Sequence, residues 1–127
     1  MLNGSLRPIL VLAVMAAALQ LPAATSAQAG RGCLPGKIKS MLSQLESRFG
    51  RVRVISTFRK GARIAGSGRR SFHASCRAVD FHPPRGKYRA VLSYLRRNFG
   101  GGIGTYRCRM HHIHIDSGPR MRWSKCA

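Results

Sequence analysis

The chain of 127 residues is long enough for one small domain and carries 23 lysine and arginine residues against three acidic ones, a formal charge of +20. A field of this sign attracts polyanions. Because the basic residues are spread along the chain, with few aromatic residues between them for base stacking, we expect no nucleic-acid partner.

The first 29 residues have the pattern of a secretory signal peptide. Arg7 gives a positive start, Ile9 to Leu19 is an uninterrupted apolar run of eleven residues, and the small residues of "AQA" suit cleavage after Ala29. The run is too short to span a bilayer, which disfavours the alternative of a retained membrane anchor. We therefore predict a periplasmic or secreted protein whose mature domain, residues 30–127, has no membrane span.

The mature domain keeps 22 basic and three acidic residues, a formal charge of +19. For an exported protein the expected polyanions are polymers and membrane surfaces of the cell envelope. The alternative is that the charge serves solubility and loose surface attraction.

The mature domain alternates between helical and strand patterns. Apolar residues at helical spacing mark two helices, each followed by glycine, and β-branched or alternating runs mark strands. The predicted elements are, in chain order, a helix over 35–49, a strand over 52–57, a long basic loop over 59–73, a short strand over 77–81, a helix over 88–99, and a closing antiparallel pair over 102–106 and 111–116. We predict a monomeric α+β domain, a small antiparallel sheet packed by two helices.

Four cysteines lie in the mature domain: Cys33, Cys76, Cys108 and Cys126. An even number in an exported small domain predicts two disulfides. Of the three possible pairings we favour Cys33–Cys126, which would join the chain ends, with Cys76–Cys108, which would join the two histidine regions. A zinc site of cysteines is disfavoured because none belongs to a Cys-x-x-Cys pair.

Three of the five histidines fall within "HHIHID", residues 111–116. Upstream, His73 precedes Asp80 by seven residues, and Asp80 stands between apolar residues of a predicted strand. A carboxylate in such a place needs a partner, which could simply be an arginine. His73, Asp80 and a later histidine would also form a three-ligand zinc set with an open fourth position, as in catalytic zinc sites.

The stretch Ser71-x-His73-x(6)-Asp80, followed by His114 in a short strand, resembles the zinc D-alanyl-D-alanine peptidases of bacterial cell walls, a superfamily that includes the Hedgehog amino-terminal domain. "STFRKG" and "GIGTY…HIHIDSGPRMRW" extend the resemblance to the VanY-like branch over residues 35–123. The resemblance implies the corresponding fold and zinc bound by His73, Asp80 and His114. It also implies that Arg59 and Ser71 hold the carboxylate of the substrate, a role that suits a guanidinium fork.

The sequence departs from this family at two positions. Cys76 replaces a usual glycine between the first two ligands, and His111 replaces the glutamate that serves many relatives as general base. The only glutamate of the mature chain is Glu46, on the first predicted helix. Another group must therefore take the proton if the protein is an enzyme.

Strand alternation indicates which group this is. His112, His114 and Asp116 would share one face and His111 the other. We predict His112 as base or oxyanion stabiliser, because neutral imidazole accepts a proton near neutral pH. His111 replaces it if a bulge reverses the faces. Asp116 is expected to orient a histidine, or to pair with Arg120 or Arg122, and His82 is expected to be a surface loop residue.

These observations predict a zinc-dependent peptidase that hydrolyses D-amino-acid-containing bonds in peptidoglycan stem peptides, as carboxypeptidase or endopeptidase. Two other classes remain open. One is an inactive zinc-containing module that binds the cell wall, and the other is a metal-free cationic protein that binds polyanions. Metal content separates the last class from the first two, and activity on purified peptidoglycan separates those two.

Overall fold

The computed structural model describes residues 30–126, so the predicted signal peptide over 1–29 lies outside the described residues. Within residues 30–126 no helix is both long enough and apolar enough to cross a membrane. The elements are, in chain order, α2 (Gly36–Phe49), β1 (Arg53–Ser56), the 3-10 helix η1 (Phe72–Ser75), β2 (Ala78–His82), α3 (Tyr88–Asn98), β3 (Gly102–Arg107), β4 (Ile113–Asp116) and β5 (Arg122–Cys126).

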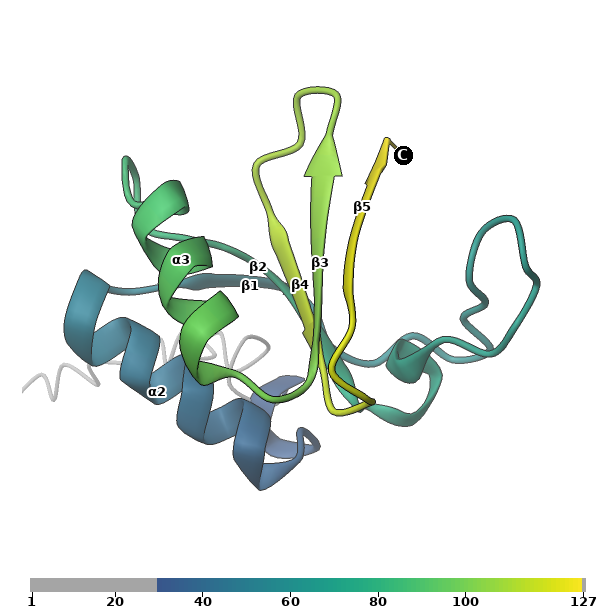
Figure 1. Cartoon of the computed structure of the whole chain (residues 1–127). Coiled ribbons are helices and arrows are strands. Elements are labelled where there is room, and N and C mark those ends of the chain that lie inside the picture. The colour runs from purple at the N-terminus through teal and green to yellow at the C-terminus, as the bar shows by residue number, and fades with distance from the viewer. Residues whose placement is uncertain (1–29, 127) are drawn as a thin grey trace, which may run out of the picture.

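The five strands form one sheet in the order β1-β2-β4-β3-β5 (Figure 1). The predicted α+β class is confirmed, and so is the antiparallel pairing of β3 with β4. The predicted antiparallel sheet is confirmed for β1, β2, β4 and β3, and β5 extends it by pairing with β3 in parallel. The strand β5 itself was not predicted, since its side chains are mostly exposed and show no apolar alternation.

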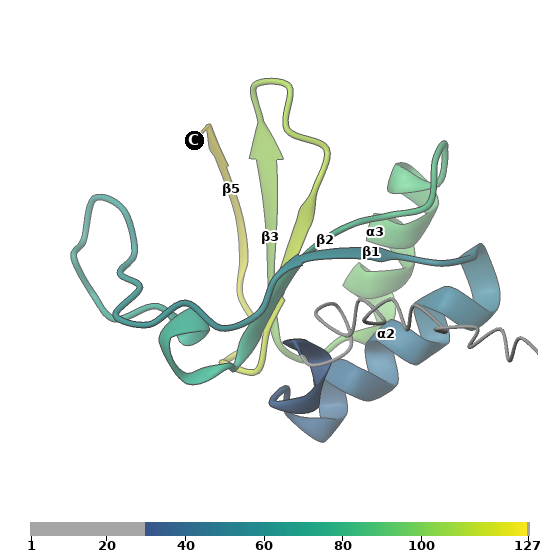
Figure 2. The ribbon, with the colours of Figure 1, turned by 180° about the vertical axis from the view of Figure 1, so that it is seen from behind.

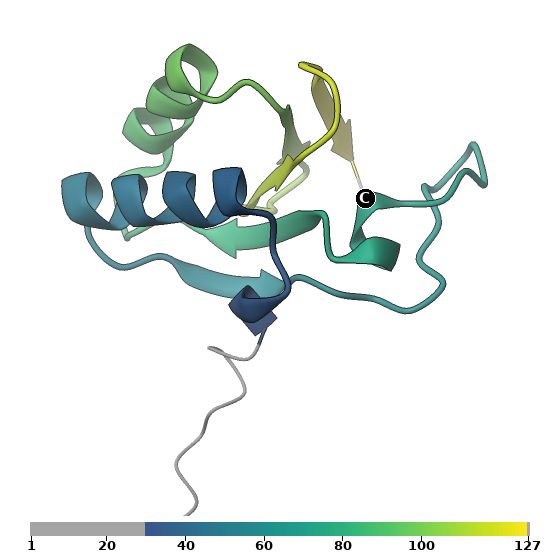
Figure 3. The same ribbon diagram turned by 90° about the horizontal axis from the view of Figure 1, so that it is seen from below.

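Both helices cover the same face of the sheet (Figures 1 and 3). They contact each other through the rings of Phe49 and Tyr94, whose centroids are 5.7 Å apart. Between helices and sheet lies the hydrophobic core, to which the strands contribute alternate residues. The core residues of α2, α3, β2, β3 and β4 are Ile38, Met41, Leu42, Leu45, Val91, Leu95, Val79, Phe81, Ile103, Ile113 and Ile115.

The alternation that fills the core also determines the opposite face of the sheet. Val79 and Phe81 of β2 enter the core, so Asp80 between them points away from the helices. Ile113 and Ile115 of β4 do the same for His114 and Asp116. The polar residues of the predicted site thus share the face that the helices leave uncovered.

Residues between β1 and η1 form the predicted basic loop. Seen from behind, the loop leaves the end of β1 and extends away from the side that holds α2 and α3 (Figure 2). A bridge between Arg63 and Arg70 and a backbone hydrogen bond of 2.7 Å from Ile64 N–H to the Arg69 carbonyl give it the form of a narrow hairpin.

Glu46, the only glutamate, has a structural role at the end of α2. Its carboxylate accepts two hydrogen bonds from the Arg31 guanidinium, at 3.0 and 2.9 Å, and one of 3.2 Å from the N–H of Val52. The hydrogen bond from Arg31 is the largest cause that lowers the pKa of Glu46. This residue ties the chain before α2 to the segment that leads into β1.

The four cysteines form two disulfides, as predicted, but the favoured pairing is wrong. The bonds are Cys33–Cys76 and Cys108–Cys126. Cys76 ends η1 in a left-handed conformation, with φ of 53°, and this turn carries its side chain to the segment before α2. Because β5 runs alongside β3, the last strand brings Cys126 opposite Arg107, next to Cys108. The chain ends are therefore not joined to each other.

We expect both disulfides to stabilise the fold, the first more than the second. Chain entropy predicts about 4 kcal/mol for a bond that closes a 43-residue loop and about 3 kcal/mol for one that closes 18 residues. Urea unfolding of Cys33→Ala/Cys76→Ala and Cys108→Ala/Cys126→Ala measures the two contributions. Peptide mapping without reduction should yield these two linkages and no free thiol, and a Cys33–Cys126 peptide would refute the assignment.

Replacing Glu46 by glutamine should lower the free energy of unfolding by roughly 1–3 kcal/mol, since two charge-assisted hydrogen bonds become neutral or are lost. The pKa of Glu46 is lower in the fold than its ordinary value of 4.5, so the carboxylate stabilises the fold above that pH. The advantage of the native protein over Glu46→Gln should be full at pH 7 and disappear as the pH falls below about 4.5. An advantage that is unchanged at pH 3 would contradict this role.

Candidate metal centre

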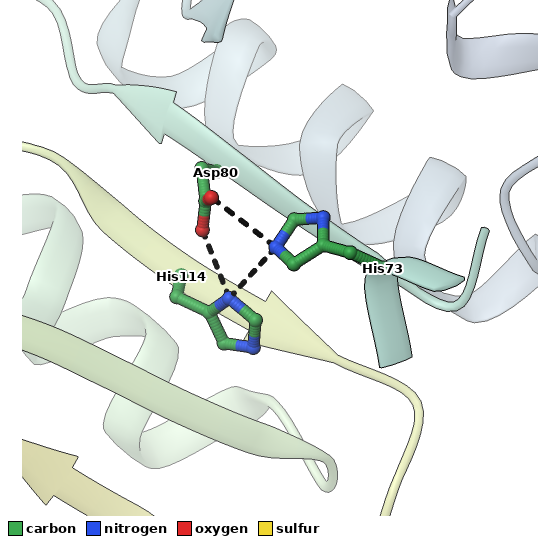
Figure 4. A group of neighbouring side chains, drawn as sticks. All are labelled: His73, Asp80 and His114. Carbon is green, nitrogen blue, oxygen red and sulfur yellow. Dashed lines mark hydrogen bonds and ion pairs between the residues drawn. The ribbon is translucent and has the colours of Figure 1, made fainter. Parts of the chain in front are cut away.

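Three elements bring His73, Asp80 and His114 together on the uncovered face of the sheet (Figure 4). Asp80 and His114 are direct neighbours across β2 and β4, where antiparallel pairing places them opposite each other. His73 comes from η1, whose first turn is capped by the Ser71 hydroxyl, which accepts a hydrogen bond of 3.2 Å from the His73 N–H. This short helix, ended by Cys76, aims the His73 ring at the sheet.

The three side chains are buried, with exposed fractions of 1% for His73, 5% for Asp80 and 7% for His114. His73 Nε2 lies 3.2 Å from Asp80 Oδ2, and His114 Nδ1 lies 2.9 Å from Asp80 Oδ1. The two ring nitrogens are 3.3 Å apart. Two nitrogens and a carboxylate thus converge on one point.

Each histidine is oriented through its other ring nitrogen. His73 Nδ1 lies 2.8 Å from the carbonyl oxygen of Thr57, and His114 Nε2 lies 3.1 Å from Asp116 Oδ2. A carbonyl and a carboxylate only accept hydrogen bonds, so His73 Nδ1 and His114 Nε2 must be the nitrogens that carry a proton. Asp116 is itself held by the N–H of Gly118, at 2.8 Å from Oδ1.

When both imidazoles are neutral, these tautomers leave three acceptors facing one another. Neutral His73 presents the lone pair of Nε2, neutral His114 presents the lone pair of Nδ1, and Asp80 presents its carboxylate. Such a buried set requires a positive charge at its centre, which either protons on the imidazoles or a bound metal ion would supply. Two imidazole nitrogens and one carboxylate oxygen, each oriented by an outer hydrogen bond, are a ligand set that fits zinc with an open fourth position.

The charges around the centre are strongly coupled. Burial alone would raise the pKa of Asp80, but hydrogen bonds from His114 and His73 outweigh it and hold that pKa well below its usual range. Asp116 behaves alike, with its pKa lowered by His114 and by the N–H of Gly118 against the effect of burial. In the absence of a metal, burial lowers the pKa of His114 and the two carboxylates raise it, and the carboxylates prevail. Both carboxylates therefore stay ionised beside the histidines.

Two glycines of β3 make room for the centre. A side chain at Gly102 would collide with the Asp116 carboxylate, and one at Gly104 would collide with the Trp123 ring. Because Gly104 lies between His114 and Trp123 in the sheet, the indole can lean over it toward His114, with the ring centroids 5.2 Å apart. Trp123 thus forms one wall of the centre.

His112 lies on the metal side, as strand alternation predicts. Its side chain is half-buried. The centroid of its ring lies 4.1 Å from that of Tyr106 and 6.0 Å from that of His82. Burial lowers the pKa of His112, while the Asp80 carboxylate acts in the opposite direction. His111 is exposed. His82, expected as a surface residue, is half-buried and extends the group of rings beside the centre.

Of the other residues predicted for the site, Arg59 and Asp116 contact the centre, and Arg120 and Arg122 do not. Arg59 reaches the centre, with its guanidinium 3.7 Å from Asp80 Oδ2 and a side chain that is 55% exposed. Asp116 pairs with His114, which decides against the alternatives Arg120 and Arg122. Arg122 instead donates to the carbonyls of Phe99 and Gly101, at 3.0 and 2.7 Å, and Arg120 is exposed.

Three residues of the centre were not predicted from the sequence. Thr57 acts through its backbone carbonyl, which leaves no signal in residue type. Tyr106 and Trp123 belong to strands, where aromatic residues most often fill a core, and only the cross-strand register shows that they face the metal side. The period-two alternation shared by Tyr106 and Gly104 could have indicated this face.

The comparisons with known proteins agree with this geometry. A family model described as peptidase M15 matches residues 18–116, which include all three converging side chains. Searches of curated proteins and of solved structures gave no match. The matched segment covers well over half of the chain, so the chain belongs to the peptidase M15 family of metallopeptidases, in the zinc D-Ala-D-Ala carboxypeptidase (VanY-like) superfamily that its motifs resemble.

Proposed function

We propose that this protein is a zinc-dependent peptidase that hydrolyses D-amino-acid-containing peptide bonds in the stem peptides of peptidoglycan. The observation that supports this most is the convergence of three buried side chains that could hold a metal ion, through His73 Nε2, His114 Nδ1 and the Asp80 carboxylate. The two disulfides indicate a protein outside the cytoplasm. The periplasm or the cell exterior, where peptidoglycan lies, is the proposed location.

His73, Asp80 and His114 would hold the zinc, which supplies a Lewis acid that polarises the scissile carbonyl and acidifies water. Thr57 and Asp116 keep the two imidazoles in the tautomers that binding needs. His112, on the same side of the sheet, would accept a proton from the attacking water and return it to the leaving amine. The rings of Tyr106 and Trp123 lie beside those of His112 and His114.

The substrate carboxylate has two partners in this proposal. The exposed Arg59 guanidinium beside Asp80 offers a fork for two parallel hydrogen bonds. The Ser71 hydroxyl accepts from the His73 N–H, which leaves its own proton free to be donated to a carboxylate oxygen. Both residues flank the turn that carries His73, so a bound carboxylate would lie next to the metal.

A specific observation favours a second function. The glutamate that serves many relatives is absent from the position of His111, and Glu46 is engaged by Arg31 at the end of α2. A zinc-containing module that binds the cell wall without cutting it would need no base. A metal-free polyanion-binding protein is the third class. That function does not explain why His73, Asp80 and His114 converge.

Digestion of purified peptidoglycan with and without added zinc tests the proposal. Mass analysis of the fragments should show release of D-amino acids or cut cross-links only with zinc, and the fragment masses identify the bond. Zinc binding without any cleavage would establish the binding module. Neither zinc binding nor cleavage would leave the polyanion-binding class.

We expect about one zinc per mature chain, measured by elemental analysis after gel filtration. His73→Ala, Asp80→Ala and His114→Ala should each lose it, because two protein ligands hold zinc poorly. His111→Ala is the matched control, since His111 is exposed, and it should keep the metal. Full zinc retention in all three ligand variants would refute the centre.

If His112 transfers the proton, His112→Ala should retain zinc and fold while turnover falls by roughly 10²–10⁴. His111→Ala should change turnover little. Zinc analysis and circular dichroism on both variants separate a loss of chemistry from a loss of structure. The opposite pattern, with His111→Ala inactive and His112→Ala active, would show that His111 takes the place of the family's glutamate.

A further inference from the structure

The hairpin between β1 and η1 is the most strongly charged segment of the molecule. We call residues 59–70 the basic arm. Five of its twelve residues are basic, and all five are exposed: Arg59, Lys60, Arg63, Arg69 and Arg70. The views from three directions show the arm extending away from the two helices (Figures 1, 2 and 3).

The arm has a defined shape rather than a random one. Ile64 exchanges backbone hydrogen bonds with Arg69 and Gly68, at 2.7 and 3.0 Å, and Ser71 N–H donates to the Ala62 carbonyl at 2.9 Å. Its base is fixed to the metal centre, because the Arg59 N–H donates to the His73 carbonyl at 3.0 Å. A polymer lying along the arm would therefore reach the centre.

The charge of the arm is not neutralised within residues 30–126. The acidic residues there are Glu46, Asp80 and Asp116, and only Asp80 approaches the arm, through Arg59. Lys60 and Arg69 make no side-chain hydrogen bond or ion pair with any described residue. Like charges held this close repel one another, and anions bound from outside the protein would offset this repulsion.

The amino-acid composition of the arm indicates which kind of anionic partner it suits. It has no aromatic residue on which bases could stack, which disfavours single-stranded nucleic acid. Its tip, Gly66–Ser67–Gly68, is small and polar and offers no apolar anchor for a lipid surface. A flexible hydrophilic polymer with regularly repeated anionic groups fits the arm better than either.

We infer that the basic arm binds the carboxylates of neighbouring stem peptides in intact peptidoglycan and so holds the polymer against the metal centre. This inference rests on the proposed function and names what its substrate must be: the polymer, rather than an isolated stem peptide. The arm then contributes to affinity for the polymer, while the bond that is cut is chosen at the metal centre. Arginine suits this role because its fork pairs with carboxylate through two hydrogen bonds.

The experiment is cosedimentation of the mature protein with purified peptidoglycan sacculi stripped of phosphodiester polymers, at low and high salt. Lys60→Gln/Arg69→Gln removes two arm charges that support no contact in the fold. Lys39→Gln/Arg89→Gln, on the outer sides of α2 and α3, is the control with the same net charge. The arm variant should bind roughly ten-fold more weakly at low salt, as two exposed ion pairs allow, and the control should bind as the native protein does. The difference should vanish at high salt.

A second experiment tests whether the carboxylates of the stem peptides are the groups that the basic arm binds. Amidation of the sacculi with a carbodiimide and a neutral amine should weaken native binding and abolish the difference between native protein and arm variant. Unchanged binding to amidated sacculi, or equal binding by arm and control variants, would overturn the inference. An arm-specific loss seen with single-stranded DNA or anionic vesicles but not with sacculi would overturn it in favour of those partners.

Cleavage is measured separately so that the two proposals fail in different ways. On a soluble stem peptide the arm variant should keep native kcat and KM, whereas on sacculi its apparent KM should rise roughly ten-fold, in line with binding. The charge reversal Lys60→Glu/Arg69→Glu should raise the apparent KM on sacculi further. One outcome is that no protein, native or variant, cleaves either substrate, while the arm variant still sediments less with sacculi than the control. The proposed peptidase activity then fails, and the inference about the basic arm stands.

Discussion

Two hydrogen bonds that fix the histidine tautomers are the constraint on which the chemistry of this protein depends. The Thr57 carbonyl holds the proton on His73 Nδ1, and Asp116 holds the proton on His114 Nε2. Only with these tautomers do both rings offer a lone pair to the point where Asp80 offers its carboxylate. The sheet supplies what the constraint needs, because strand alternation places Asp80, His114 and Asp116 on one face while their neighbours fill the core.

The scarcity of acidic residues shapes the rest of the molecule. Asp80 and Asp116 serve the metal centre, and Glu46 ties the segment before α2 to β1 through Arg31. No carboxylate is left for the general base that many relatives use, so in the proposed mechanism the base is an imidazole, and His112, on the side of the centre, is the candidate. Among residues 30–126 no exposed anionic side chain lies near the arm, which leaves its cations accessible to an anionic polymer.

Sequence patterns predicted the parts of this structure that follow from local periodicity. Both helices and four strands were found because each directs one row of apolar side chains toward the core, and alternation along residues 111–116 placed His112 and His114 on one face. β5 was missed because its exposed side chains carry no such period and its parallel pairing with β3 is a long-range event. The disulfide pairing failed for a similar reason, since Cys33 meets Cys76 only through the turn of η1. The Thr57 carbonyl has no side-chain signal at all.

Histidine tautomers can be read directly from two-bond ¹H–¹⁵N correlation spectra, and this measurement on the zinc-loaded mature protein tests the central claim most directly. We predict that His73 carries its proton on Nδ1 and binds metal through Nε2, and that His114 carries its proton on Nε2 and binds metal through Nδ1. The two rings should therefore show opposite tautomers. Zinc-loaded protein in which His114 binds through Nε2, or in which either ring is unaffected by zinc, would contradict the account.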